Sequence, residues 1–271
     1  MASAPPRNRF ARSTLIRLLS DLAAADVAES PLTVAERLGP WLDWTDAIAL
    51  STALQAPPSA AKVAPALAAR AARAAADELA RVRSTLSRAI TSDEALCAPD
   101  APGAAEGSGD AKAPPDFTPY RLSCGLHQRA MTAAIGPLRQ RVRAALAAAS
   151  PALARLAAMD EVLDAAMTQR ERHALGRVPA LLERHARLRG QPGQVQVDWV
   201  EGTTGQAAEP APLGATVQRV LLAELDIRLK PIEGMMDALK QAHAAATGIN
   251  TTATGLPAGT PATSSAPGAA R

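Results

Sequence analysis

Cysteine and histidine are the side chains of this sequence best suited to metal chemistry, and one pair stands close together. Cys124 and His127 occur in the order Cys-Gly-Leu-His, and Cys97 precedes them across a loop-like region. A tetrahedral zinc site needs four ligands, however, and no second pair with matching spacing follows. We therefore predict no metal site and interpret the pair as a buried or half-exposed thiol beside a surface imidazole.

The other polar residues give no catalytic signature. The remaining histidines, His173, His185 and His243, do not stand in an HExxH motif or in the setting of an activated serine or cysteine nucleophile. Acid pairs such as Asp43 and Asp46 are common on solvated helix faces. A Gly-Ser-Gly sequence lies in an acidic stretch, without the strand and helix that nucleotide-binding motifs require. We therefore expect no catalytic residue, no bound cofactor and no enzymatic activity.

A row of arginines is the clearest electrostatic feature. On an ideal helix Arg121, Arg129, Arg139 and Arg143 fall within a sector of about 80°, and no acid occurs from residue 117 to residue 159. We call these four residues the basic stripe. Such a stripe suits nucleic acid, anionic lipid or an acidic protein surface. Few aromatic residues accompany it for base stacking, and the acidic stretch that precedes it could neutralise it within the chain.

Two tryptophans form the other candidate surface. Trp41 and Trp44 are three residues apart, and large aromatic side chains dominate binding hot spots. In a chain with so few aromatic residues, the pair could equally form the core of an N-terminal helical unit, and we favour that interpretation. The two alternatives become one if this core forms only between subunits.

The elements that would position these residues are predicted to be helices. The chain has 271 residues, of which 48% are hydrophobic, but it contains only 2 Phe, 1 Tyr and 3 Trp, and alanine is abundant. Alanine is the strongest helix former, whereas strands favour aromatic and β-branched residues. The composition therefore predicts an all-α protein.

The pattern divides the chain into five parts. Residues 1–12 are expected to be flexible, 13–90 to form an N-terminal helical unit, 91–116 to be a disordered acidic linker, 117–246 to form a bundle of long helices, and 247–271 to be a disordered tail. In the first unit, Pro40 is expected to begin a helix that extends to about residue 54. The long helices predict an elongated antiparallel bundle with a coiled-coil-like C-terminal unit.

The C-terminal unit carries the clearest helix signals. Ser150 followed by Pro151 predicts a helix start, and the new helix should extend toward residue 188 with a bend near Gly176 and Pro179. The last helix has apolar residues at alternating spacings of three and four, which is typical of a coiled-coil or bundle seam. This seam consists of Leu222, Leu225, Leu229, Ile232, Met236 and Leu239.

The overall charge and cysteine content favour an intracellular setting. The formal net charge is +3, two cysteines are too few for a secreted disulfide framework, and no apolar run approaches the ~20 residues of a membrane span. We expect a soluble cytoplasmic protein.

Three segments resemble an uncharacterised bacterial all-helical family described only as a domain of unknown function. They are Asp-Val-Ala-Glu-Ser at 26–30, Ala-Glu-Arg-Leu-Gly-Pro-Trp-Leu-Asp-Trp-Thr-Asp-Ala-Ile-Ala-Leu-Ser at 35–51, and Leu-Leu-Ala-Glu-Leu-Asp-Ile-Arg-Leu-Lys-Pro at 221–231. The resemblance implies no activity, cofactor or catalytic residue. Members of the family are encoded near envelope proteins of the proton-channel and outer-membrane-anchor type, which implies a subunit of a larger envelope-associated assembly.

The sequence thus predicts a non-enzymatic helical scaffold or adaptor that acts through protein partners or self-association. We expect the tryptophan pair and the seam to be the surfaces through which the protein binds these partners. The alternative is electrostatic binding of nucleic acid or an anionic membrane surface through the basic stripe, with nucleic acid the less favoured ligand because charge alone is non-specific.

Overall fold

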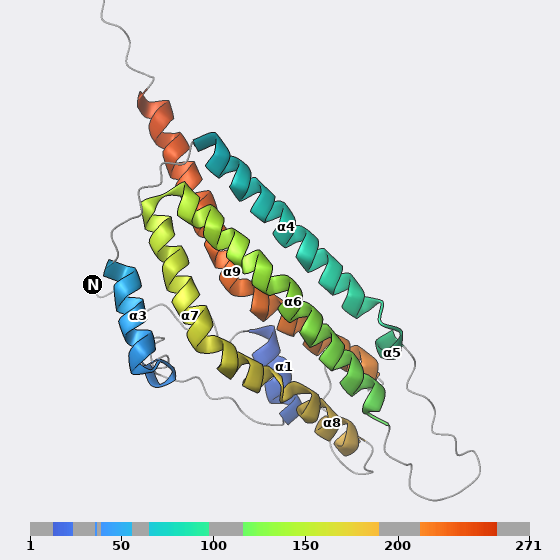
Figure 1. The fold of residues 1–271 in the computed structure, drawn as a ribbon. Helices are drawn as coiled ribbons and strands as arrows, with labels where there is room; N and C mark the ends of the chain where they lie inside the picture. Colours follow the sequence, from blue (N-terminus) through green and yellow to red (C-terminus); the bar gives the residue numbers. More distant parts are fainter. Residues whose placement is uncertain are drawn as a thin grey trace, which may run out of the picture.

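Helices make up the regular structure of the protein. The computed structural model describes residues 13–23, 36, 39–55, 65–97, 116–189 and 212–253, with the side chains of 65, 189 and 246–253 excepted. Within these ranges the chain forms helices and no strand, which confirms the all-α fold (Figure 1).

Long helices lie side by side and give the bundle its elongated shape (Figure 1). They are α4 (Pro65–Thr91), α6 (Thr118–Ala149), α7 (Pro151–Leu175) and α9 (Leu213–Ala253). Helix α4 runs antiparallel to α6, and α6 runs antiparallel to α7, as the sequence predicts. Helix α6 packs against α4, α7 and α9. No helix in the described ranges is both long and apolar enough to cross a membrane.

The turn between α6 and α7 forms as predicted. The Ser150 hydroxyl accepts a hydrogen bond from the Leu153 amide at 3.3 Å, and Pro151 is the first helical residue. The prediction of one bent helix toward residue 188 is wrong, because α7 ends at Leu175 and α8 (Val178–Arg189) follows. The break lies at Gly176, whose amide donates to the carbonyl of Arg172 at 3.0 Å.

Short helices flank the bundle. Helix α1 (Thr14–Ala23) buries Leu15, Leu18 and Leu22 and packs against α8 and α9. Helix α3 (Trp44–Gln55) packs against α7 and follows a 3-10 turn, η2 (Gly39–Trp41).

The start of α3 corrects the prediction that Pro40 opens this helix. Pro40 lies in the 3-10 turn instead. The Asp43 carboxylate accepts from the Asp46 amide at 2.8 Å, and the Asp46 carboxylate accepts from the Asp43 amide at 3.2 Å. This reciprocal pair is a capping box that satisfies two exposed amides. Asp43 and Asp46 therefore have a structural role at the start of the helix.

A single hydrophobic core joins helices from both sides of residues 98–115. Ile90 of α4, Met131 of α6 and Leu229 of α9 are all buried in the same cluster. The helices expected to form a separate N-terminal unit thus pack against those of the C-terminal bundle. The backbone of α9 also remains helical to Ala253, beyond the expected start of a tail at residue 247.

The first residues of the expected linker differ from the prediction, because they are folded and packed. Residues Glu94–Cys97 form the short helix α5, and Leu96 is buried against the start of α9. The approach is so close that a Cβ atom at Gly214 would overlap the carbonyl oxygen of Leu96. Glycine at position 214 thus permits α5 to dock on α9.

This close approach gives a testable prediction. Gly214→Ala is expected to lower the free energy of unfolding by about 1–3 kcal/mol, because α5 and α9 must move apart. Gly234 is the matched control in the same helix, since a Cβ there meets no atom within 4 Å. Gly234→Ala should raise the free energy of unfolding by about 0.5–1 kcal/mol. Urea denaturation measures both, and equal effects would contradict the docking of α5.

Candidate functional site

The tryptophan pair lies at the surface. Trp44 is 80% exposed and Trp41 is 45% exposed, and Ile48, one turn further along α3, is 49% exposed. The structure therefore does not place the two indole rings in the core, and this corrects the interpretation that the sequence favours. We call Trp41, Trp44 and Ile48 the α3 ridge.

The orientation of α3 follows from its sequence. Ala53 is buried and Leu50 is half-buried, so this side of the helix faces α7, while Trp44 and Ile48 share the opposite side. Arg170 of α7 also donates to the carbonyl oxygen of Pro40 at 3.5 Å, next to Trp41. The only charged residue of α3 is Asp46, which is engaged in the capping box. The outward face therefore carries no charged side chain, and the α3 ridge shares it with the exposed polar residues Ser51, Thr52 and Gln55.

The predicted seam is filled from within the chain. Its residues Leu225, Leu229, Ile232, Met236 and Leu239 are buried, and Leu222 is half-buried. They belong to the core cluster that α9 forms with α4 and α6. The seam therefore stabilises the bundle, and its side chains are not available as a free surface.

Half of the basic stripe forms a cluster of ion pairs with α7. Arg139 donates to Asp160 at 2.6 and 2.9 Å and to Asp164 at 2.6 Å. Arg143 donates to the same two carboxylates at 2.7 and 2.8 Å. The side chains of Arg139 and Arg143 are only 15% and 14% exposed. We call these four residues the α6–α7 clamp.

The clamp lowers the pKa of Asp160 below its usual value. Burial by itself acts to raise this pKa, but the hydrogen bonds and positive charges of Arg139 and Arg143 outweigh it. Burial likewise acts to lower the pKa of Arg143, and its hydrogen bonds to Asp164 and Asp160 reverse this to a net increase. Both groups therefore remain charged at neutral pH.

The rest of the stripe is divided between a paired and an exposed arginine. Arg121 forms an ion pair with Glu183 of α8. Arg129 is exposed, and it makes no ion pair within the described part of the chain. Three of the four arginines of the stripe are thus paired within the chain, with acids of α7 and α8. Residues 98–115 of the predicted acidic linker lie outside the described residues. The basic stripe does not present four free charges to a polyanion.

The Cys124 and His127 pair is buried. His127 Nε2 lies 2.8 Å from a carboxylate oxygen of Asp93, so the expectation of a surface imidazole is wrong. Burial raises the pKa of the Cys124 thiol to about 12, and the nearby carboxylates of Glu224 and Asp93 add to this increase. The thiol therefore stays protonated. No group of three metal-binding side chains occurs among the described residues.

A buried polar network on α9 was not predicted from the sequence. Glu224 is fully buried and accepts from Arg228 at 2.8 and 3.1 Å and from Gln128 of α6 at 3.0 Å. Gln128 also donates to the carbonyl of Leu175 at 3.1 Å. The signal for it in the sequence is the pair Glu224 and Arg228 at a spacing of four, which places both side chains on one side of the helix.

The clamp predicts a pH-dependent stability. Asp160→Asn should lower the free energy of unfolding at pH 7 by about 1–3 kcal/mol, because two poorly exposed guanidinium groups lose a carboxylate. The folded-state pKa of Asp160 is lowered, so its contribution is present above the unfolded value of 3.8 and is lost as the pH falls through the folded value. Urea denaturation at neutral and at strongly acidic pH measures this.

The control for the clamp is Glu161→Gln, which removes the neighbouring exposed acid of α7. The difference in the free energy of unfolding between wild type and Asp160→Asn should become smaller at acidic pH. Glu161→Gln should have the same free energy of unfolding as wild type at both pH values. If Asp160→Asn lowers the free energy of unfolding equally at both pH values, the α6–α7 clamp is not the source of the pH-dependent stability.

The two thiols should differ in reactivity. Cys97 is exposed, whereas Cys124 is buried with a raised pKa, and thiolates are the reactive form. A maleimide at neutral pH should label Cys97 in the folded protein and Cys124 only after unfolding, as mass spectrometry can show. Rapid labelling of the folded Cys97→Ser variant would contradict the packing around Cys124.

The comparisons with known proteins place the chain in a family without assigning a function. A family model described as a protein of unknown function (DUF3348) matches residues 1–241. No curated protein and no solved structure matches the chain. The match covers most of the sequence, and it confirms the resemblance carried by the segments around the tryptophan pair and in α9. The chain belongs to the DUF3348 family of proteins of unknown function.

Proposed function

We propose that this protein is a non-enzymatic helical scaffold or adaptor that binds a protein partner through the α3 ridge. The observation that carries the proposal is the exposure of Trp44. Its side chain is 80% exposed, although the chain contains only 3 Trp. An exposed indole ring costs free energy in water, and this cost is recovered when a partner covers the ring.

The chemistry of the ridge supports a protein partner. Tryptophan is enriched at binding hot spots, and contiguous exposed apolar patches on monomers are often functional. The outward face of α3 carries no charge, so its partner needs an apolar face of similar size. A polyanion or a metal ion would find nothing to bind there.

The rest of the bundle supports a scaffold role because it holds the ridge on a rigid base. Helix α3 packs on α7, and the α6–α7 clamp joins α7 to the centre of the bundle. A binding surface on a rigid element loses little conformational entropy when a partner docks.

Most charged groups of the basic stripe and the charged groups of the buried network on α9 are engaged within the chain, so we assign them structural roles. Arg139 and Arg143 each bind two carboxylates, so binding of nucleic acid or anionic membranes through the basic stripe is the less favoured alternative. The buried Glu224 is likewise engaged by Arg228 and Gln128. Two unpaired cysteines fit the reducing cytoplasm in which we place the protein. A partner within a larger assembly agrees with what the family resemblance implies.

The test compares Trp44→Ala with Ser51→Ala, a matched substitution at an exposed position of the same helix. Loss of a hot-spot residue costs about 2 kcal/mol or more, or roughly a thirty-fold loss of affinity. Tagged protein is recovered from the native host, and its companions, other than copies of this chain, are quantified by mass spectrometry.

We expect Trp44→Ala to lose its companions while its helix content by circular dichroism stays unchanged. Ser51→Ala should retain them. If both variants recover the same companions as wild type, the α3 ridge is not the partner-binding surface.

A further inference from the structure

Four arginines line the side of α4 that faces away from the bundle. They are Arg70, Arg73, Arg81 and Arg88, and we call them the α4 arginine face. At about 100° per residue, they fall within a sector of about 80° on the helix. All four are exposed. About 27 Å of helix separates the first from the last.

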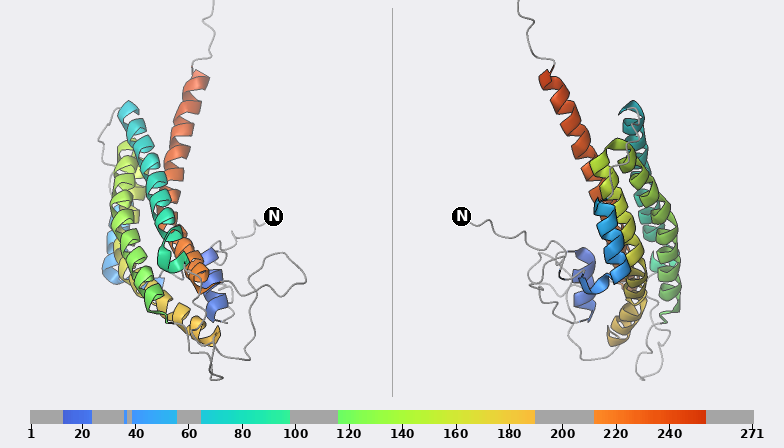
Figure 2. Two further views of the ribbon diagram at one scale, coloured as in Figure 1. Left: turned by 90° about the vertical axis from the view of Figure 1, so that its right-hand side faces the viewer. Right: turned by 60° about the vertical axis from the view of Figure 1, so that its left-hand side comes forward.

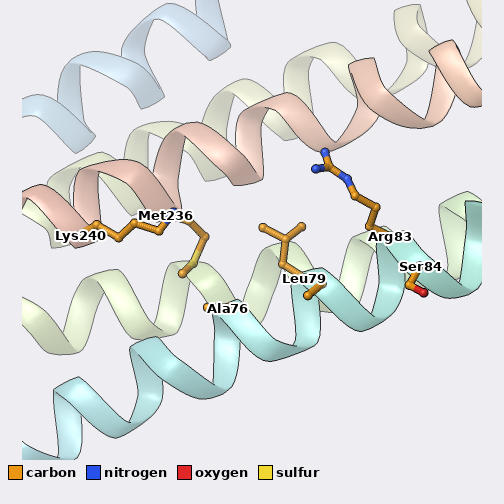
Figure 3. Close-up of a pocket in the computed structure, with 7 residues that line it drawn as sticks. Ala76, Leu79, Arg83, Ser84, Met236 and Lys240 are labelled. Atoms are coloured by element: carbon orange, nitrogen blue, oxygen red, sulfur yellow. The ribbon is translucent and has the colours of Figure 1, made fainter.

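The packing of α4 explains why these arginines point outward. Leu79 and Leu86 lie in or against the core cluster, and Figure 3 shows Leu79 and Arg83 pointing from α4 toward α9. Leu79 is nine residues from Arg70 and nine from Arg88, which places both arginines at about 180° from it. In the left view of Figure 2, α4 lies in front of the bundle, and no helix that the structure describes covers it.

Most of the positive charge on this face has no acid beside it. Among the residues that the structure describes, Arg70 and Arg73 form no ion pair, and Arg88 donates to the Ser84 hydroxyl at 3.1 Å. Arg81 pairs with the Glu78 carboxylate. This carboxylate also pairs with Arg141 of α6 at 2.9 Å, so that two guanidinium groups share one acid.

The balance of charge differs from that of the basic stripe. Asp77 is the one acid within the sector of the α4 arginine face, so four cations accompany a single anion there. In the basic stripe, Arg139 and Arg143 each bind two carboxylates. A surplus of fixed positive charge on one side of a rigid helix attracts a polyanion.

We propose that the α4 arginine face binds the phosphate backbone of duplex nucleic acid without reading its sequence. This inference goes beyond the proposed function, because it assigns a second ligand to a surface other than the α3 ridge. The expectation against nucleic acid that the sequence gives concerns the basic stripe of α6, which is a different surface.

The composition of the face favours a ligand that is held by charge. The large apolar residues between positions 70 and 88 are Leu79, Val82 and Leu86, and all three lie in or against the core. A protein partner needs apolar anchors at the centre of its contact, and a helix that inserts into a membrane surface needs an apolar face. The α4 arginine face offers neither. Contacts between arginine and phosphate, by contrast, supply most of the affinity of sequence-independent nucleic-acid binding.

The form of α4 favours a duplex over a single strand. The arginines are fixed on one regular helix of 27 residues. A DNA duplex is stiff over this length, since its persistence length is about 50 nm, so no flexible chain has to be ordered on binding. Proteins that bind single strands usually stack the bases on aromatic side chains, and α4 contains none.

Counterion release gives the size of the expected effect. If each of the four arginines contacts one phosphate, the logarithm of the association constant should fall with the logarithm of the salt concentration with a slope of about −3.6. A fourfold increase in salt should then weaken binding roughly a hundredfold. Removal of one arginine should bring the slope closer to zero by about 0.9.

The test measures the fluorescence anisotropy of a labelled DNA duplex of about 20 base pairs, which is longer than the face at about 3.4 Å per pair, with the full chain at several salt concentrations. Arg70→Gln/Arg73→Gln removes two arginines of the face, and glutamine preserves helix propensity. Arg155→Gln/Arg184→Gln is the matched control, because it removes the same charge from exposed positions of α7 and α8. Circular dichroism verifies that each variant is folded.

Asp77→Asn provides a variant that should bind more tightly. It removes the one acid of the face, so the affinity for the duplex should rise about two- to five-fold at low salt. Glu161→Gln removes an exposed acid of α7 and should bind the duplex like wild type.

Wild type and the control should show the steep salt dependence, while Arg70→Gln/Arg73→Gln should have a slope of about −1.8 and bind about tenfold more weakly at low salt. Wild type that does not bind the duplex at low salt overturns the proposal. An equal loss of affinity in the control does so too, because binding would then reflect net charge alone. Retention on vesicles of phosphatidylserine and phosphatidylcholine without binding to the duplex would identify a membrane-binding surface instead.

The outcomes also separate this inference from the proposed function. Trp44→Ala should bind the duplex like wild type, because Trp44 lies on α3. If Arg70→Gln/Arg73→Gln keeps the companions that depend on Trp44 but loses the duplex, both proposals stand. If wild type binds no duplex while Trp44→Ala still loses its companions, only the inference about α4 fails.

Discussion

The burial of α9 against its neighbours is the interaction on which the rest of the structure depends. Its apolar residues contact α4, α6 and α5, so one helix joins elements from both halves of the chain. With few aromatic residues in the core, alanines such as Ala145 and Ala223 let the helices approach closely, and leucine, valine and methionine fill the remaining space. Removal of this apolar area from water, at roughly 25 cal/mol per Å², supplies the stabilising free energy. Helix α5 can dock only because Gly214 leaves no side chain in its path.

Charged groups then determine how the helices align along this core. The α6–α7 clamp fixes the register of two antiparallel helices, and Glu224 ties α9 to α6 through Gln128. Buried ion pairs cost desolvation energy, so their contribution lies more in selecting one alignment than in net stability. At two places the distribution of side chains departs from the usual one. Several arginines and acids are turned inward against each other, while two of the largest apolar side chains remain in water. The exposure of these two side chains is the observation on which the proposed partner-binding role of the α3 ridge rests.

Much of the fold could be predicted from local signals. The Ser150 cap and Pro151 define the turn between α6 and α7, because a cap and a proline act on the backbone beside them. The α9 seam was evident from its spacing. The start of α3 was mispredicted because the Asp43 and Asp46 capping box competes with Pro40 for the same role, and the reciprocal hydrogen bonds prevail.

The α6–α7 clamp could also be derived from the sequence. A tight antiparallel turn at Ser150 brings Arg139 and Arg143 opposite Asp160 and Asp164, so their similar distances from the turn indicate the ion pairs.

By itself, the sequence determined the helical fold, the strong helix boundaries and the apolar face of α9, because propensity, capping and periodicity act between residues a few positions apart. Only the tertiary structure decided which of these faces are free. The tryptophans and the seam leucines look alike as apolar residues at helical spacing, yet Trp44 is exposed and Leu229 is buried. The arginines of the basic stripe look free in the sequence, yet most of them bind acids of α7 and α8. Exposure and pairing depend on which helices meet, and that depends on contacts between residues far apart in the chain.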